Sequence, residues 1–305
     1  MKKLGTQRIV LFVLMTLTAG LAMTAAAEPL ILTAVAQEDR IQIFADGILF
    51  TEYRFRPEQK YPYFYPVNGP ASSESVTTET SEPYPHHHSL FFGCDRVNGG
   101  NYWQDVNERG QIVSETVKCQ QAKGDKIVIT NQCLWKRSGA EPPFRDERTI
   151  TITAPSESLR IIDFDVEVTA LMDAHIEKTN HSLFSARMVP ELAVTGGGTL
   201  VNANGDKSEK GTFGVKAPWC DYFGTRNGVT EGLAIFDHPA NPWHPSKWFT
   251  RDYGFFSPTE MNWLEDGSVD LFKDEINRLR YRVVVHEGDV EKAEIAKLYQ
   301  NWIQE

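Results

Sequence analysis

The chain has 305 residues, of which 41% are hydrophobic and 24% charged, and its formal net charge at pH 7 is −10. This composition is typical of a folded globular protein, and the length allows one large domain or two small ones. The acidic balance argues against a nucleic acid or an anionic membrane surface as the partner.

The N-terminus has the three parts of a secretory signal peptide. A basic start over residues 2–8 precedes an apolar run over 9–23, and small residues up to Ala27 follow. The run is shorter than the ~20 residues of a membrane-spanning helix, so an anchor is the weaker interpretation, and no later segment is long enough to span. We expect 1–27 to be removed on export and 28–305 to form a single domain in the periplasm or the medium.

Strand patterns dominate the rest of the chain. Short apolar or alternating runs cover residues 30–35, 40–44, 48–53, 112–119, 126–135, 147–153, 159–171, 233–236 and 279–286. Asp46-Gly47 predicts a tight hairpin turn, and Gly124-Asp125 predicts another. Residues 160–168 alternate between apolar and charged side chains, which is typical of an antiparallel sheet with one wet face.

Only the C-terminus has a helical pattern. Apolar residues recur at helical spacing over 290–303, and Asp289 is a suitable N-cap. Residues 70–85 are rich in Ser, Thr and Glu and predict a long loop. Many strands, hairpin turns and one late helix together predict an all-β fold, a large antiparallel β-sandwich with a C-terminal helix.

The four cysteines, Cys94, Cys119, Cys133 and Cys220, permit disulfides in an oxidising compartment and allow three connectivities. Cys119 and Cys133 flank a predicted hairpin and can lie close together. Buried free thiols are the equal alternative.

A first candidate site is the run Pro85-His86-His87-His88, which leads into an apolar strand. In an extended strand His86 and His88 face one way and His87 the other. Two histidines at this spacing can share a divalent metal, or one can act as a general base. No carboxylate lies at ligand spacing nearby, so we expect no cofactor and keep a metal at His86 and His88 as the alternative.

A second candidate site covers residues 179–191. As a strand, this segment directs Phe184, Ala186 and Met188 to the core. The opposite face then carries His181, Ser185, Arg187 and Glu191. Histidine or glutamate can act as acid or base, and arginine can hold a carboxylate or a sugar oxygen. An ordinary solvated face is the alternative.

A third candidate site is the Pro-rich stretch 236–245, followed by Trp248, Arg251 and Tyr253. Prolines and aromatic residues predict a rigid, ordered loop. Tryptophan beside Asp237 and His244 suits stacking on a sugar ring with directed hydrogen bonds. A loop that only seals the sandwich is the alternative.

Several catalytic signatures are absent from the sequence: GxSxG, the Walker loop, GxGxxG, HExxH and paired-cysteine metal sites. Elbow-type serine hydrolases, nucleotide enzymes and common zinc proteases are therefore not the leading interpretations.

Taken together, these stretches resemble the DUF6807 family, which is also labelled "methane oxygenase PmoA". The stretches that carry the resemblance are 63–70, 85–93, 97–99 with Trp103, 160–171, and 234–239 through 251–254. The family carries an arginine after its paired histidines, where His88 stands in this chain. A membrane monooxygenase subunit needs several long apolar spans, which argues against the methane label.

The resemblance implies a fold similar to the supersandwich of galactose mutarotase-like proteins and a setting of polysaccharide use. Residues 179–184 also look like the TNHxxF stretch of aldose mutarotases, which implies a catalytic acid at His181.

The leading hypothesis is an exported carbohydrate-active enzyme, a lyase, hydrolase or epimerase, that acts on a sugar or uronate by general acid–base catalysis. The expected catalytic residues are His87 and His181, with Glu191 and Tyr253 as partners. The expected substrate-binding residues are Asn68, His86, Trp103, Arg187, Asp237, His244, Trp248 and Arg251.

Two alternatives belong to other functional classes. One is a non-catalytic carbohydrate-binding protein with a platform of Trp103, Trp243 and Trp248. The other is a metal-dependent oxidoreductase using His86, His88 and one of His238 or His244. The leading hypothesis and the first alternative share a small sugar or oligosaccharide as the expected ligand.

Overall fold

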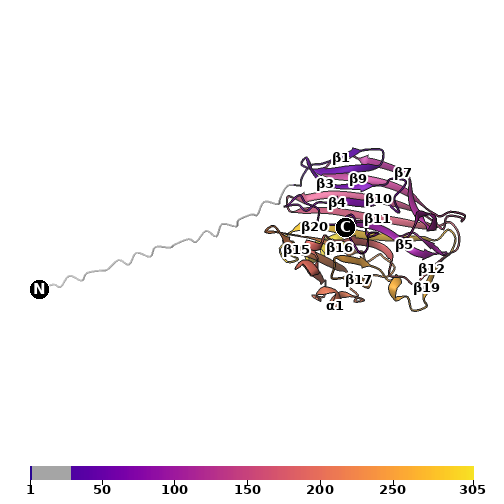
Figure 1. The fold of residues 1–305 in the computed structure, drawn as a ribbon. Coiled ribbons are helices and arrows are strands. Elements are labelled where there is room, and N and C mark those ends of the chain that lie inside the picture. Colours follow the sequence, from indigo (N-terminus) through magenta and orange to yellow (C-terminus); the bar gives the residue numbers. More distant parts are fainter. Residues whose placement is uncertain (2–28) are drawn as a thin grey trace.

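The computed structural model describes Met1 and residues 29–305, so the expected signal peptide lies, apart from Met1, outside the described residues. The protein consists of two antiparallel sheets packed face to face (Figure 1). This arrangement confirms the predicted all-β sandwich with a C-terminal helix. Among the described residues, no helix is both long and apolar enough to cross a bilayer.

The first sheet has twelve strands. Its main path runs β17 (Trp248–Arg251), β18 (Phe255–Pro258), β13 (Ser182–Arg187), β5 (Leu90–Val97), β4 (Tyr63–Val67), β3 (Ile48–Arg54), β2 (Arg40–Ala45), β1 (Leu32–Ala36) and β8 (Lys123–Gly124). Three short strands lie off this path: β6 (Gly100–Asn101), β12 (Ala174–Glu177) and β19 (Ser268–Leu271). They extend the sheet beyond β5, where Figure 1 shows β12 and β19 at one end of the molecule.

The second sheet has eight strands. Their order is β14 (Thr199–Asn202), β15 (Trp219–Arg226), β16 (Val229–Asp237), β20 (Ile276–Glu287), β11 (Leu159–Ala170), β10 (Phe144–Ser156), β9 (Lys126–Lys136) and β7 (Gln111–Gln121). The strands expected from sequence lie within or beside these bounds. Asp46 and Gly47 have φ of 46° and 82°, as the predicted hairpin turn requires.

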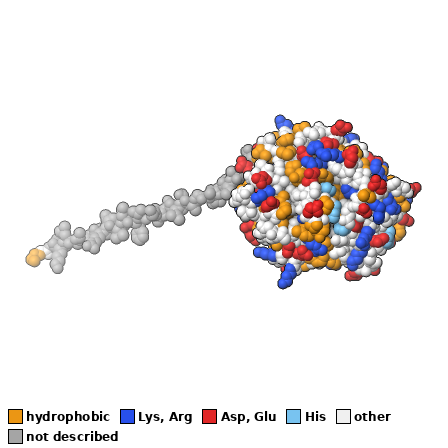
Figure 2. Space-filling view, viewed as in Figure 1, with side chains coloured by type: hydrophobic (Ala, Val, Ile, Leu, Met, Phe, Trp, Pro, Cys, Tyr) orange, Lys and Arg blue, Asp and Glu red, His pale blue; other side chains and the backbone are white. Residues whose placement is uncertain are grey.

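The alternation over residues 160–168 has the expected result. The apolar side chains of this stretch of β11 are buried, and the acids on its other face pair across to β20. These ion pairs are Asp163 with Arg282, Asp165 with Arg280 and Glu167 with Arg278. Elsewhere too, acidic and basic side chains are interspersed over the surface that Figure 2 shows.

Aromatic rings hold the two sheets together. Phe184 of β13 stacks on Tyr281 of β20 with ring centroids 5.1 Å apart, and Phe92 of β5 contacts Phe164 of β11 at 5.9 Å. These contacts identify the inner face of the first sheet. Side chains that alternate with Phe184 along β13 therefore point to the outer face.

The C-terminal helix α2 (Ile295–Trp302) is shorter than the predicted 290–303. The Asp289 carboxylate accepts bonds from the backbone N–H groups that follow it, but it caps a turn and not the helix. Glu294 interrupts the helical conformation with a left-handed φ of 52°. The helix packs Tyr299 and Trp302 onto the second sheet.

The remaining helices are short. They are α1 (Ser208–Thr212), which packs on β17, and 3-10 turns at Asn107–Arg109, Pro190–Leu192, Val194–Gly196 and Met261–Trp263. All four cysteines are free thiols. Cys119 pairs in register with Ile129 and Cys133 with Ser114, so the two thiols of this hairpin do not face each other.

The expected loop over 70–85 contains no named strand, and Glu231 of the second sheet anchors its start. The buried Glu231 carboxylate accepts bonds from the Ala71 N–H at 2.7 Å, the Ser72 N–H at 2.8 Å and the Ser72 hydroxyl. A Cβ at position 69 would overlap the Glu231 side chain, which explains the glycine there. The loop and the second sheet are thus held together by one carboxylate.

We predict that Glu231→Ala lowers the free energy of unfolding by roughly 2–4 kcal/mol, because three donors lose a charged acceptor. Glu231→Gln keeps one acceptor oxygen, so we expect a smaller loss. Denaturant unfolding measures both. Glu74→Ala removes an exposed carboxylate of the same loop and serves as the control. A loss for Glu231→Ala no larger than the control would contradict this anchoring role.

A buried ion pair links β15 and β20. His286 Nε2 lies 3.0 Å from Asp221 Oδ1, and both side chains are fully buried. Burial opposes the charged form of His286, but the Asp221 carboxylate outweighs it and raises the pKa of His286 above its usual value. This pair therefore contributes stability that depends on pH.

We predict that His286→Gln destabilises the protein more at about pH 6 than at about pH 9. The raised pKa makes the contribution of His286 fully present below its unfolded-state pKa of about 6.5, and it is lost as pH rises through the folded-state value. Urea unfolding at both pH values measures it, with the exposed His175→Gln as control. A destabilisation that does not change with pH would refute the ion pair.

Candidate functional site

Residues 86–88 precede β5 and do not form the extended strand that the sequence predicted. Ser89 has a left-handed φ of 56°, which turns the chain just before the strand begins. His86 and His87 therefore contact each other, with ring centroids 4.5 Å apart. His88 instead stacks on Tyr63 at 5.1 Å. The expected shared face of His86 and His88 is wrong, because the chain is bent here.

Strand β13 supplies the second part of the site. Its register places Ser185 opposite Phe91 of β5, and Arg187 opposite Phe255 of β18. Because Phe184 faces the core, Ser185 and Arg187 point to the outer face of the first sheet, as predicted. Leu183 has a left-handed φ of 66°, an unfavourable conformation for a branched residue. Such outliers gather at functional sites.

His181 lies just before β13 and is oriented by a carboxylate. Its Nδ1 is 3.1 Å from Oδ2 of Asp95, a buried residue of β5, and 3.2 Å from Nε2 of Gln104. The Asp95 carboxylate favours the tautomer with a proton on Nδ1. The Nε2 atom of His181 is then the acceptor, on a side chain that is 24% exposed.

Aromatic rings join these segments into one group. His87 stacks on Phe255 at 4.3 Å and on Tyr84 at 5.4 Å, and Tyr84 stacks on Tyr253 at 5.1 Å. His86 and Trp103 each lie 5.9 Å from the His181 ring. We call this group the histidine cluster; its members are Tyr84, His86, His87, Asp95, Trp103, His181, Arg187, Tyr253 and Phe255.

Burial keeps the two adjacent histidines neutral. Burial is the main cause that lowers the pKa of His86 to about 4 and that of His87 to about 2, and the nearby positive charge of Arg187 lowers both further. Burial also raises the pKa of Tyr253 to about 12, so its hydroxyl keeps its proton near neutral pH. Near pH 7 these three side chains are neutral hydrogen-bonding groups.

Arg187 carries an uncompensated charge in the cluster. It is 3% exposed, its guanidinium carbon lies 4.3 Å from the centre of the Tyr253 ring, and its Nη2 donates to the Ser81 hydroxyl at 3.3 Å. Among residues 29–305 no carboxylate forms an ion pair with it, and its Nε and Nη1 atoms have no partner. Burial accordingly lowers the pKa of Arg187.

Other buried nitrogens of the cluster are also without partners: Nε2 of His86, Nδ1 of His87 and Nε1 of Trp103. Buried polar atoms in folded proteins are normally hydrogen-bonded, and the exceptions require an explanation. His86 contacts His87, and His86 and Trp103 each lie beside His181, so the cluster is suited to a ligand that carries several hydrogen-bonding oxygens.

The third candidate site, residues 236–253, lies mostly outside the histidine cluster. The Asp237 carboxylate accepts bonds from Asn241 Nδ2 at 2.7 Å and the Ser246 N–H at 2.9 Å, and it lies 3.3 Å from His244 Nδ1. Trp248 is fully buried and donates its indole N–H to the Ala217 carbonyl. These polar groups already have protein partners, so this loop is an internal scaffold. Tyr253 is the member that reaches the cluster.

The remaining candidates lie outside the cluster. Arg251 pairs with Glu209 at 2.9 Å and lies over Phe249, whose ring contacts Phe255. Asn68 donates to the Leu49 carbonyl at the base of the anchored loop. Glu191 is exposed in a 3-10 turn, and the described contacts do not connect it to the cluster.

Within residues 29–305, no three His, Cys, Asp or Glu side chains converge as metal ligands. The rings of His86 and His88, the pair considered for a shared metal, face different neighbours: His181 and Tyr63, respectively.

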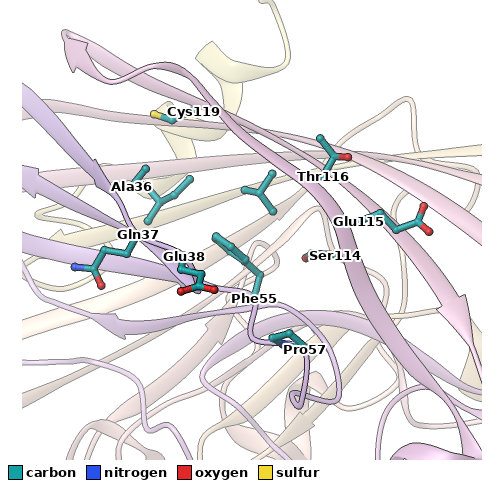
Figure 3. Close-up of a pocket in the computed structure, with 11 residues that line it drawn as sticks. Ala36, Gln37, Glu38, Phe55, Pro57, Ser114, Glu115, Thr116 and Cys119 are labelled. Atoms are coloured by element: carbon teal, nitrogen blue, oxygen red, sulfur yellow. The ribbon is translucent and has the colours of Figure 1, made fainter.

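A cavity of about 320 Å³, which shares no lining residue with the cluster, lies where β1 and the residues after β3 meet the edge strand β7 (Figure 3). Its charged lining residues are Glu38 and Glu115. None of the buried unpartnered atoms belongs to its lining. The buried unpartnered nitrogens of the histidine cluster thus lie outside this cavity.

Four members or neighbours of the cluster, Tyr84, Asp95, Gln104 and Phe255, were not predicted from sequence. Asp95 is an acid within the apolar run of β5, a signal that sequence reasoning could have used. Tyr84 lies in a polar loop, and Gln104 follows Trp103 in a connecting segment; neither has a distinctive local pattern.

Comparison with solved structures gives three distant similarities. A galactose mutarotase-related enzyme from Lactobacillus acidophilus is 8% identical, with 83% of this chain and 96% of that chain covered and a TM-score of 0.31. A heparinase III is 11% identical over 82% and 29% of the two chains, with a TM-score of 0.29. A polysaccharide lyase is 9% identical over 87% and 33%, with a TM-score of 0.30.

The chain spans about a third of the length of that heparinase and that lyase. No curated protein matches it. Residues 40–300 match DUF6807, described as a family of unknown function, and this match covers more than half of the chain. The resemblance found in the sequence is thereby confirmed, and the chain belongs to the DUF6807 family.

Proposed function

We propose that the chain is an exported carbohydrate-active enzyme that transfers protons at the histidine cluster by general acid–base catalysis. The observation that supports this proposal is the Asp95–His181 pair, which lies beside the His86 ring at 5.9 Å, whose buried Nε2 atom has no protein partner. A group that can move a proton thus lies next to groups that require ligand oxygens.

In this proposal His181 is the proton-transferring residue. Asp95 holds the imidazole with its Nδ1 proton directed inward, which leaves Nε2 to take a proton from the sugar or return one to it. His87 is less suited to the role that the sequence suggested, because a pKa of about 2 makes it a very weak base. We assign His86 and His87 to hydrogen bonds with sugar hydroxyls.

The aromatic members provide the apolar part of a sugar site. Tyr84 is 37% exposed and is the cluster ring best suited to stack on a sugar face. Tyr253 lies beneath Tyr84 and keeps its hydroxyl proton, so it is available as a hydrogen-bond donor. The same rings would also serve a carbohydrate-binding protein without catalysis, which is the second candidate function.

We predict that His181→Ala lowers kcat/KM roughly 10²- to 10⁴-fold, the usual contribution of a positioned acid–base residue. Turnover is measured on mono- and oligosaccharides, including oxidised and uronic sugars. His175→Ala is the matched control, because His175 also pairs with an aspartate, Asp270, but on the exposed surface. A protein that binds sugars calorimetrically and turns none over would be a binding protein, and full activity of His181→Ala would exclude its proposed role.

We further predict that Asp95→Asn lowers kcat much more than it raises KM, because an amide no longer holds His181 in the reactive tautomer. Asp95 is a positioning residue in this proposal. The matched control is Asp270→Asn in the exposed pair. If Asp95→Asn lowers the melting temperature and changes kcat and KM by similar factors, Asp95 has only a structural role.

A further inference from the structure

Arg187 differs from the other buried arginines of the described chain in how its charge is satisfied. Arg148 pairs with Asp146 at 2.7 Å, and Arg160 donates to three backbone carbonyls. Arg187 has one hydroxyl, Ser81 Oγ, and the face of the Tyr253 ring. A buried cation without a carboxylate is costly unless a ligand supplies the opposite charge.

The surroundings of Arg187 are rich in donors and poor in negative charge. The neutral imidazoles of His86 and His87 and the indole of Trp103 each have a nitrogen without a partner. The one carboxylate of the cluster, Asp95, is paired with His181 through Oδ2, and its buried Oδ1 has no partner. Sugar hydroxyls could satisfy these hydrogen bonds, but they would leave the guanidinium charge unbalanced.

We propose that Arg187 forms the subsite for an oxyanion carried by the sugar, which makes acidic sugars the substrate class of this site. This inference rests on the proposed function and specifies its substrate. A uronate carboxylate matches the planar guanidinium best, and a sulfate ester presents the same oxyanion chemistry. Arg187 thus recognises the substrate, while His181 exchanges the proton.

The first test needs no variant. Calorimetry compares oligogalacturonate and oligoglucuronate with their carboxyl-reduced counterparts and with a sulfated neutral oligosaccharide. We expect the carboxylated sugars to bind roughly tenfold or more tightly than the reduced ones. Preference for the sulfated sugar would identify the oxyanion as a sulfate ester. Equal binding of acidic and reduced sugars, or no binding of any acidic sugar, would overturn the proposal.

The second test uses variants of Arg187. Arg187→Met removes the charge and keeps an apolar side chain that can pack on Tyr253, whereas Arg187→Lys keeps the charge and loses the planar fork. We expect Arg187→Met to abolish the preference for acidic sugars and Arg187→Lys to reduce it. Arg278→Met removes an exposed cation from the ion pairs between β11 and β20 and is the control.

Thermal unfolding separates a binding role from a structural one. We expect the melting temperature of Arg187→Met to be unchanged or raised, because the variant removes an unpaired buried charge. Arg148→Met leaves the Asp146 carboxylate buried without its partner, so we expect its melting temperature to fall. A marked fall in the melting temperature of Arg187→Met, with the preference for acidic sugars retained in that same variant, would assign Arg187 to the fold. Binding of uronates without turnover would support the Arg187 subsite and contradict the proposed enzymatic function. Turnover of neutral sugars alone would support the enzymatic function and contradict the subsite.

Discussion

The candidate site depends on three neighbouring strands, β5, β13 and β18, whose two faces are both covered. Successive side chains of a strand point to opposite faces, so Phe184 is committed to the core and Arg187 to the histidine cluster. A shift of β13 by one residue would turn its core-facing side chains toward the cluster and its cluster-facing side chains toward the core. The inner aromatic contacts therefore fix the register of the strands, and the register fixes where the cluster's side chains stand.

The buried charged side chains differ in whether the fold supplies an opposite charge, and this difference separates structural pairs from a candidate binding residue. The charge of Arg148 is balanced by the Asp146 carboxylate, which also accepts the indole N–H of Trp135, although Arg148 Nη1 has no partner. His286 and Asp221 form another pair. Arg187 is buried to the same degree but has no acid, and its neutral neighbours cannot supply one. The cluster therefore differs from the other buried charged sites because the Arg187 charge has no acidic partner.

Much of the fold was readable from sequence, because alternation of side chains has a direct structural cause. The wet face of β11 and the inward direction of Phe184 follow from period-two patterns alone. The grouping of His86 with His181 was not readable, since it requires the pairing of β5 with β13 across some ninety residues. Asp237 and Trp248 have the residue types of a sugar site, yet the fold satisfies them internally. A sequence does not show whether a polar group already has a partner.

The loop over 70–85 connects these results, because it links the second sheet to the cluster. Glu231 holds its start, the Thr78 N–H bonds to the Arg187 carbonyl, and the Tyr61 hydroxyl holds the His86 carbonyl at its end. Between these anchors, Tyr84 is exposed, its side chain has only ring contacts, and its backbone bonds only to Ser81 and His87. Segments with few buried contacts open most readily. The stretch around Tyr84 is therefore the part of the cluster best able to rearrange around the proposed ligand, while strand β13 holds Arg187 and positions His181 just before it.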